Sequence, residues 1–272
     1  MNNLEFMYIQ SLLLEKLGIS LEDSKEYLVQ SRLNPIAQAH GMNNYHDLVK
    51  YLRINKDNTL IKSVLEAMLT HETYFFRDVK FYDSLKDHVI PEIIKNNRHT
   101  KELKILSCAC STGQEPYSLA IMLTENFPEL ASWNISIKAF DYSANAIEKA
   151  KSACYTSYEV NRGLSEALIS KYFTNNGKHW TLRSDIRNLV YYFRANLLEN
   201  LPDVSAADLL LLRNVLIYFD LDNKKNILKS IQTYIKPSGY LFLGSGETTL
   251  GLTNELTKVR INNCEGYQLL LS

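Results

Sequence analysis

Apolar residues recur at helical spacing through roughly the first 70 residues of the chain. The first apolar stripe predicts a helix that stops at Gly18, because glycine readily adopts the left-handed conformation that ends helices. We expect Ser20 to cap a second helix, which should stop near Pro35 because proline disfavours helix in the residue before it. Two more helices are expected, at residues 45–52 and 60–69. The sequence therefore predicts a small all-helical N-terminal domain.

The pattern changes after about residue 100, where short apolar runs alternate with helical segments. Pro116 and Ser143 each open a predicted helix directly after an apolar run. Strands that alternate with helices are typical of an α/β fold with a largely parallel, doubly wound sheet. The predicted strands of this sheet are residues 103–109, 135–140, 207–212 and 239–244.

One stretch departs from this alternation. Residues 180–183 and 189–194 are both strand-like, and no helix is predicted between them. A turn signal at residues 175–178 precedes them. We expect a small antiparallel unit inserted into the main domain.

Composition removes several classes of function. The 30 basic and 30 acidic residues give a formal net charge of zero, so no excess charge favours nucleic acid or an anionic membrane. No segment approaches the roughly 18 apolar residues of a membrane span, so no membrane insertion is expected. The four cysteines are expected to be reduced thiols in a cytoplasmic protein. The six histidines are scattered, and no metal site is predicted.

Polar residues follow the predicted strands at the edge where doubly wound sheets bind ligands. Residues 111–115 contain a glycine and lead into a helix, which suits either a ligand-binding turn or an ordinary strand-to-helix turn. Asp141 ends the next strand, where an acid takes ribose hydroxyls or begins a helix. Arg213 and Asn214 leave the most apolar strand and need partners, either a ligand or a structural salt bridge. Residues 196–197 would add an amide at the same rim.

These segments occur in an order that resembles the CheR family of chemotaxis protein methyltransferases over nearly the whole chain. Two of the matching segments are highly specific, namely residues 106–120 and 212–220. The others are residues 69–78, 139–143, 195–198 and 239–247.

The resemblance implies a Rossmann-type methyltransferase domain with a small antiparallel β-subdomain, preceded by an all-helical domain. The implied organisation is a helical domain at 1–75, a linker and the start of the catalytic domain at 76–98, and the methyltransferase domain at 99–272. The β-subdomain is expected near 176–195. The implied reaction transfers a methyl group from S-adenosylmethionine to glutamate side chains of chemoreceptors, which are methyl-accepting chemotaxis proteins, and leaves S-adenosylhomocysteine.

The resemblance also implies the residues of the site. An Arg and a Tyr that lie near the transferred methyl group in the family match Arg77 and Tyr218. The implied cofactor-binding residues are His71, Thr73, Arg77, Glu115, Asp141, Asn196, Leu197, Arg213 and Asn214.

Three departures from the family pattern bear on these expectations. His71 stands where the family usually has Asn, and Gln114 where it usually has Glu. The loop at 174–180 is shorter than in members that dock on a receptor's C-terminal pentapeptide, so we expect no pentapeptide tethering. Two alternatives remain open, namely a small-molecule methyltransferase on the same scaffold and a non-catalytic cofactor-binding scaffold protein.

Overall fold

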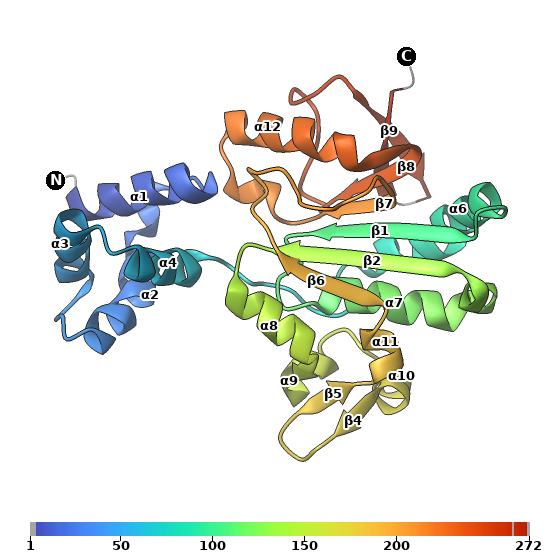
Figure 1. Ribbon diagram of the computed structural model, residues 1–272, viewed down its shortest axis with the longest axis horizontal. Coiled ribbons are helices and arrows are strands. Elements are labelled where there is room, and N and C mark those ends of the chain that lie inside the picture. The colour runs from blue at the N-terminus through green and yellow to red at the C-terminus, as the bar shows by residue number, and fades with distance from the viewer. Residues whose placement is uncertain (1–3, 263, 271–272) are drawn as a thin grey trace. The chain divides into compact units, whose positions relative to one another are not determined.

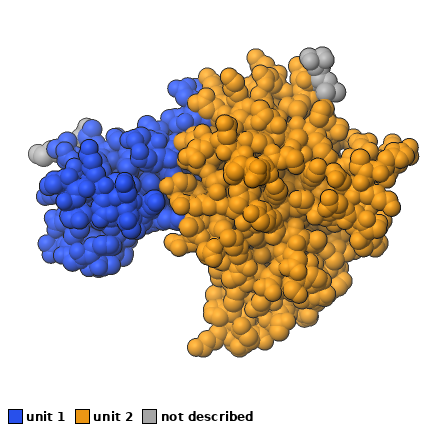
Figure 2. All heavy atoms as spheres, in the orientation of Figure 1, with its two compact units in different colours: residues 1–70, 218–223 blue, residues 71–217, 224–272 orange. Residues whose placement is uncertain are grey.

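The computed structural model describes residues 4–262 and 264–270, and the chain divides into two compact units (Figure 2). The first unit contains residues 1–70 together with 218–223. The second contains residues 71–217 and 224–272. The chain thus leaves the first unit at residue 70 and returns to it for a short segment near residue 220.

The described residues of this unit before residue 70 form four α-helices and a short 3-10 helix at Asp23–Lys25. The first helix ends at Leu17, and Gly18 follows with a φ of 68°, as its sequence predicted. The four helices are α1 (Leu4–Leu17), α2 (Glu26–Ala39), α3 (Tyr45–Asn55) and α4 (Asn58–Met68). Their buried side chains include Ile9, Val29, Leu33, Leu48 and Val64, all at 0% exposure.

Two predicted boundaries of the second helix are wrong. Ser20 does not cap it, because α2 begins at Glu26 with no side-chain cap and the Ser20 N–H instead donates to the carbonyl of Tyr218. Pro35 does not end it, because α2 continues to Ala39. Leu33 and Ala37 lie on either side of Pro35 and are fully buried. Their packing keeps the helix intact although proline lacks one hydrogen-bond donor.

The returning segment 218–223 pairs with the loop that follows α1. Ile19 forms an antiparallel bridge with Phe219, and the Ser20 N–H lies 2.9 Å from the Tyr218 carbonyl oxygen. Asn223 donates from its side chain to the carbonyl of Gly18. These bonds make six residues from late in the sequence part of the helical unit.

The second unit contains a seven-stranded sheet with the order β6-β2-β1-β7-β8-β10-β9 (Figure 1). The first five strands in this order pair in parallel, and β10 and β9 are antiparallel. The strands are β1 (Glu102–Cys108), β2 (Asn134–Asp141), β6 (Val190–Arg194), β7 (Ala207–Leu212), β8 (Ile235–Leu243), β9 (Leu256–Ile261) and β10 (Cys264–Leu269). The doubly wound α/β prediction is therefore confirmed, with an antiparallel extension at one edge.

Helices connect and flank these strands (Figure 1). In the part of the chain that the structure describes, no helix combines the length and apolar character needed to cross a membrane. The α-helices are α5 (Val79–Ser84), α6 (Ile90–Asn97), α7 (Gln114–Asn126), α8 (Ala144–Ser152), α9 (Ser157–Asn161), α10 (Glu166–Tyr172), α11 (Ser184–Arg187) and α12 (Leu221–Ile231). A π-helical turn at Leu85–Val89 joins α5 to α6, and 3-10 helices occupy Pro128–Ser132, Leu216–Tyr218 and Gln232–Tyr234.

A separate three-stranded antiparallel sheet contains β3 (Cys154–Tyr155), β5 (Trp180–Leu182) and β4 (Phe173–Asn175). The prediction that residues 189–194 belong to this small sheet is wrong. Helix α11 follows β5, and β6 then pairs in parallel with β2 of the main sheet. The reason is the buried Tyr192, whose ring packs edge-on against Tyr117 of α7 and so ties this strand to the main core.

Candidate active site at the carboxyl ends of the strands

The turn between β1 and α7 has an unusual backbone. Ala109, Ser111 and Gly113 all have positive φ values, of 53°, 52° and 93°. A Cβ atom at Gly113 would lie 2.8 Å from the Tyr192 hydroxyl oxygen, so only glycine fits this close approach. Left-handed residues other than glycine are costly and concentrate at functional sites. The turn lies at the carboxyl edge of the sheet, where ligands of such folds bind.

Asp141 ends β2 beside this turn. Its Oδ2 accepts the Ser111 N–H at 2.8 Å, and its Oδ1 accepts the Ser143 N–H at 2.9 Å. The side chain that caps α8 is Ser143, whose Oγ accepts the Ala146 N–H. Ser143, and not Asp141, is therefore the N-cap residue of α8. Asp141 itself fixes the turn and presents a carboxylate at the strand end.

Arg213 is the centre of a buried ion network. Its side chain is only 2% exposed, and its Nη1 donates to Glu115 Oε2 at 2.8 Å while its Nη2 donates to Asp78 Oδ2 at 2.6 Å. The guanidinium carbon lies 4.0 Å from the centroid of the Phe81 ring. Burial disfavours the charge, but the adjacent carboxylates outweigh this effect, so the pKa of Arg213 is raised. The structural salt bridge considered for Arg213 is present, and it positions Glu115, which also accepts from Ser107 Oγ at 2.8 Å.

Asn214, the next residue, is held by Glu247. Glu247 Oε2 accepts the N–H groups of Asn214 and Gly244, each at 2.7 Å. Its Oε1 accepts the N–H groups of Val215 at 2.9 Å and Ile217 at 3.3 Å. Asn214 has a left-handed backbone with a φ of 57°. One carboxylate thus fixes the backbone of the whole loop that follows β7.

The loop before α5 carries Arg77. The Arg77 Nη1 donates to the backbone carbonyl of Glu72 at 2.9 Å, and its guanidinium lies 5.7 Å from the centroid of the Tyr74 ring. The Glu72 carboxylate points elsewhere and forms an ion pair with Arg162 Nη2 at 2.5 Å. Arg162 also stacks over Tyr74, at 4.3 Å from the ring centroid. Arg77 makes no ion pair with any described residue.

The small sheet supports both of these loops. Phe75 is fully buried, and its ring packs edge-on against Tyr155 at 5.1 Å and Phe173 at 5.6 Å. The Tyr155 hydroxyl donates to the carbonyl of Thr112 in the turn before α7, at 2.8 Å. Tyr155 therefore contacts the Arg77 loop and the glycine turn at once.

The predicted site residues are brought together in part. His71 lies beside the turn, because its carbonyl accepts from Ser111 Oγ at 3.2 Å. Asn196 follows Ala195, whose N–H bonds the Asp141 carbonyl at 3.1 Å. Thr73 is half-buried and Leu197 is buried. Tyr218 belongs to the helical unit and Arg77 to the other, so their joint action remains a prediction.

Sequence reasoning assigned no function to three residues that build this site. They are Asp78, Ser107 and Glu247. All three lie within segments that match the family, which was the available signal. Asp78 bonds Arg213, 135 residues away, and Glu247 bonds Asn214, 33 residues away, so the local pattern could not reveal these two bonds.

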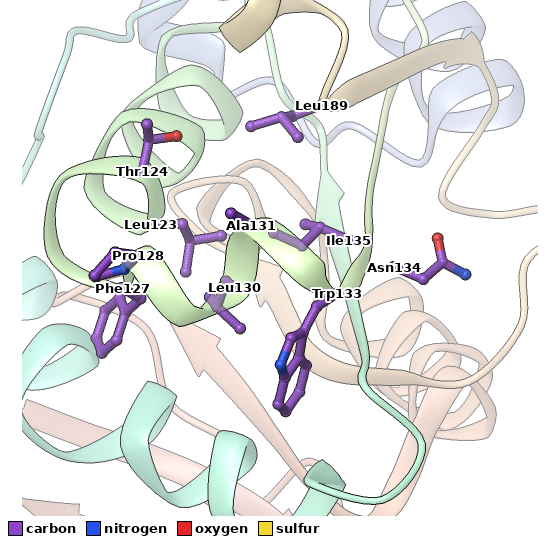
Figure 3. Close-up of a pocket in the computed structure, with 10 residues that line it drawn as sticks. All are labelled: Leu123, Thr124, Phe127, Pro128, Leu130, Ala131, Trp133, Asn134, Ile135 and Leu189. Atoms are coloured by element: carbon purple, nitrogen blue, oxygen red, sulfur yellow. The ribbon is translucent and has the colours of Figure 1, made fainter.

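A cavity of about 310 Å³ lies elsewhere, between the end of α7 and the start of β2 (Figure 3). Leu123, Phe127, Leu130, Trp133 and Ile135 are among its largely apolar lining residues. Asn134 and Ile135 begin β2, so this cavity is at the amino ends of the strands, opposite the edge with Asp141. It is not the cofactor site. Within the described residues, no group of three or more His, Cys, Asp or Glu side chains could hold a metal ion.

The donor and acceptor set at the carboxyl edge fits S-adenosylmethionine. The carboxylates of Asp141 and Glu115 are the acceptors that ribose hydroxyls and an ammonium group need. The cofactor also carries a sulfonium cation, and the Arg213 charge at this edge is already neutralised by two carboxylates. Gly113 lets backbone approach a ligand closely.

Comparisons with known proteins identify the family. The model of the CheR methyltransferase SAM-binding domain matches residues 71–264, and that of the CheR methyltransferase all-alpha domain matches residues 4–69. The chain is 37% identical over 271 residues to the chemotaxis protein methyltransferase Cher2 of Pseudomonas putida, covering 98% of each chain. It is 35% identical to chemotaxis protein methyltransferase 1 of Vibrio cholerae, covering 93% of this chain and 92% of that relative. The chain belongs to the CheR methyltransferase family and is an S-adenosylmethionine-dependent methyltransferase of chemotaxis.

Proposed function

We propose that this enzyme works in the cytoplasm and forms methyl esters on glutamate side chains of chemoreceptors. Two relatives that match over more than nine tenths of the chain are named chemotaxis protein methyltransferases. The observation that carries the choice of a carboxylate acceptor is the state of Arg77. It is a half-buried cation with no ion-pair partner among the described residues.

Arg77 has donors available for an acceptor. A guanidinium has five N–H donors, and Arg77 uses one of them on the Glu72 carbonyl. Charge-assisted hydrogen bonds from the remaining donors would hold a carboxylate strongly and in a defined orientation. The backbone on both sides of Arg77 is left-handed, with φ values of 51° at Phe76 and 66° at Asp78, so the loop gives Arg77 a defined direction.

The other proposed binding residues divide the cofactor between them. Asp141 and Glu115 would accept from ribose and amino groups, with Asn196, Leu197 and Asn214 completing the rim. His71 and Thr73 would contribute from the loop that carries Arg77. The remaining proposed contact, Arg213, would act by holding Glu115 in place.

The bound cofactor supplies an electrophilic methyl group on a sulfonium sulfur. A glutamate carboxylate is ionised at neutral pH and needs no general base. One carboxylate oxygen would form the new O–CH3 bond while the electron pair of the broken S–CH3 bond would stay on sulfur, so no residue of this chain would have to move a proton. Arg77 therefore works by holding the acceptor in line with the methyl group. We propose that Tyr218 shapes the methyl end of the site.

We further propose that the enzyme reaches receptors without a pentapeptide tether. The connection between β4 and β5 is a tight turn in which the Asn176 N–H donates to the His179 carbonyl at 3.0 Å. A turn of this length offers little loop for binding an extended peptide. The helical bundle of the receptor itself would then be the docking partner.

The test is methyl transfer from radiolabelled S-adenosylmethionine to membranes that hold chemoreceptors of the same organism. We expect base-labile label on a receptor-sized band, and loss of most of it with Arg77→Ala. Arg98→Ala is the matched control, because Arg98 is an exposed arginine at the end of α6 in the same unit. Label on a small molecule alone would contradict the proposal in favour of a metabolite acceptor. Cofactor binding without label on any acceptor would favour a scaffold protein.

A further inference from the structure

The Arg77 loop contains an acidic residue, Glu72, whose side chain could compete with a receptor carboxylate for Arg77. Glu72 lies five residues before Arg77 in the sequence, and its backbone oxygen is 2.9 Å from Arg77 Nη1. A glutamate side chain is long enough to reach a guanidinium so close to its own backbone. If it did so, an intramolecular carboxylate would occupy the donors that a receptor carboxylate needs.

The structure places the Glu72 carboxylate on a different arginine. Arg162, which follows α9, holds it through a 2.5 Å ion pair. Both guanidinium groups lie close to the Tyr74 ring, Arg162 at 4.3 Å and Arg77 at 5.7 Å from its centroid. The two arginines therefore share one aromatic neighbour, and Glu72 is bonded to Arg162 through its side chain and to Arg77 only through its backbone.

The backbone around Arg162 is fixed against the same loop. The Arg162 N–H donates to the Tyr158 carbonyl at 3.2 Å. Gly163 packs so closely that an added Cβ atom would lie 1.8 Å from the Phe75 carbonyl oxygen. Phe75 is itself anchored in the small sheet by Tyr155 and Phe173. Arg162 thus has a set position relative to Glu72.

We propose that Arg162 is a positioning residue for methyl transfer, which holds the Glu72 carboxylate away from Arg77 and keeps Arg77 available to the acceptor carboxylate. This inference rests on the proposed function of Arg77. Its effect is on acceptor binding, because the Arg77 donors that Glu72 would occupy are those proposed to hold the receptor carboxylate. It also gives the segment between β3 and β4 a place in catalysis, because that segment carries Arg162 next to the Arg77 loop.

The expected effect is moderate. The Arg162 and Glu72 side chains are 37% and 55% exposed, so solvent weakens their pairing and any new pairing of Glu72 with Arg77. Exposed ion pairs change equilibria by about fivefold or less. Arg162→Ala should therefore lower kcat/KM for the receptor by about three- to fivefold.

The test is a double-mutant comparison in the radiolabel assay, with receptor concentration varied. We expect Arg162→Ala to be slow, Glu72→Gln to match the wild type, and Arg162→Ala combined with Glu72→Gln to recover wild-type kcat/KM. Recovery on removing a second residue is an outcome that loss of a purely structural contact would not give. Arg183→Ala is the control, because Arg183 forms an exposed ion pair with Asp185 beside the same small sheet.

Two results would overturn the inference while leaving the proposed function intact. One is an Arg162→Ala enzyme with the wild-type kcat/KM for receptor, and the other is a double variant as slow as Arg162→Ala. Absence of label with the wild-type enzyme would instead overturn the proposed function, and this inference with it.

Discussion

Glu247→Gln tests whether one carboxylate holds the loop that follows β7. The substitution keeps the size of the side chain and removes its charge. The amide oxygen can keep the two 2.7 Å bonds to Asn214 and Gly244, but the amide NH2 then faces the N–H groups of Val215 and Ile217. The two backbone N–H donors would then face another donor and lose their hydrogen bonds.

The magnitude follows from these bonds. The Val215 bond is short, at 2.9 Å, whereas the Ile217 bond is 3.3 Å long and Ile217 is exposed, so its N–H can turn to water. Leaving the half-buried Val215 N–H without a partner costs about 1–2 kcal/mol, at the lower end of the range for buried groups, and loss of the charge weakens the two bonds that remain. We expect a total of about 2–3 kcal/mol. For a unit of this size that lowers Tm by roughly 5–10 °C.

The assay combines thermal unfolding with calorimetric binding of S-adenosylhomocysteine. We expect Glu247→Gln to bind more weakly, because Asn214 keeps its left-handed backbone only while the loop is held. Glu265→Gln is the control, since it removes only the exposed ion pair with Lys258. A Glu247→Gln enzyme that melts and binds like the wild type would show that the carboxylate does not hold this loop.

Three further expectations concern the same unit. Arg213→Met should destabilise it by about 3–5 kcal/mol in urea unfolding, because two carboxylates lose a buried partner; unchanged stability would contradict the network. Gly163→Ala should lower Tm far more than Gly177→Ala, because a Cβ at Gly163 meets the Phe75 carbonyl while Gly177 has open space and a similar φ; equal shifts would point to backbone strain alone. Burial raises the pKa of Tyr117 to about 12, above its unfolded value of about 10. The contribution of Tyr117 to the free energy of unfolding is therefore intact below about pH 10 and is lost as pH rises toward 12. In Tyr117→Phe, the free energy of unfolding should fall less steeply between about pH 10 and 12 than in the wild type. An equally steep fall would contradict this assignment.

Much of the fold could be predicted from local sequence. Buried parallel strands are nearly continuous apolar runs, so residues 207–212 were recognisable as a strand, and all six are buried. The end of the first helix was predictable because the left-handed backbone of Gly18 is a property of the glycine itself and needs no distant contact. The helix end predicted near Pro35 was wrong because the burial of Leu33 and Ala37 outweighs the local preference of proline. The sheet predicted for residues 189–194 was wrong because packing against distant residues decides which strands pair, and a short stretch of sequence does not contain those residues.

The site shows the same division. Asp141 lies at the end of β2 and Glu115 in the first turn of the helix that follows β1, and both positions follow from the topology that the alternation of strands and helices predicts. The partners of Arg213 do not, because Asp78 lies 135 residues away in the sequence. Whether a charge serves a ligand or a salt bridge depends on such distant pairings.

Cutting the chain at residue 70 would not release an intact helical unit. Ile19 and Ser20 would lose their backbone partners at Phe219 and Tyr218, and Phe219, which is 7% exposed, would be missing from the unit that buries it. Exchange of this unit between relatives must therefore carry residues 218–223 as well. Tyr218, which we propose lies near the methyl group, belongs to this returning segment, so an exchange of the helical unit would also exchange that proposed contact.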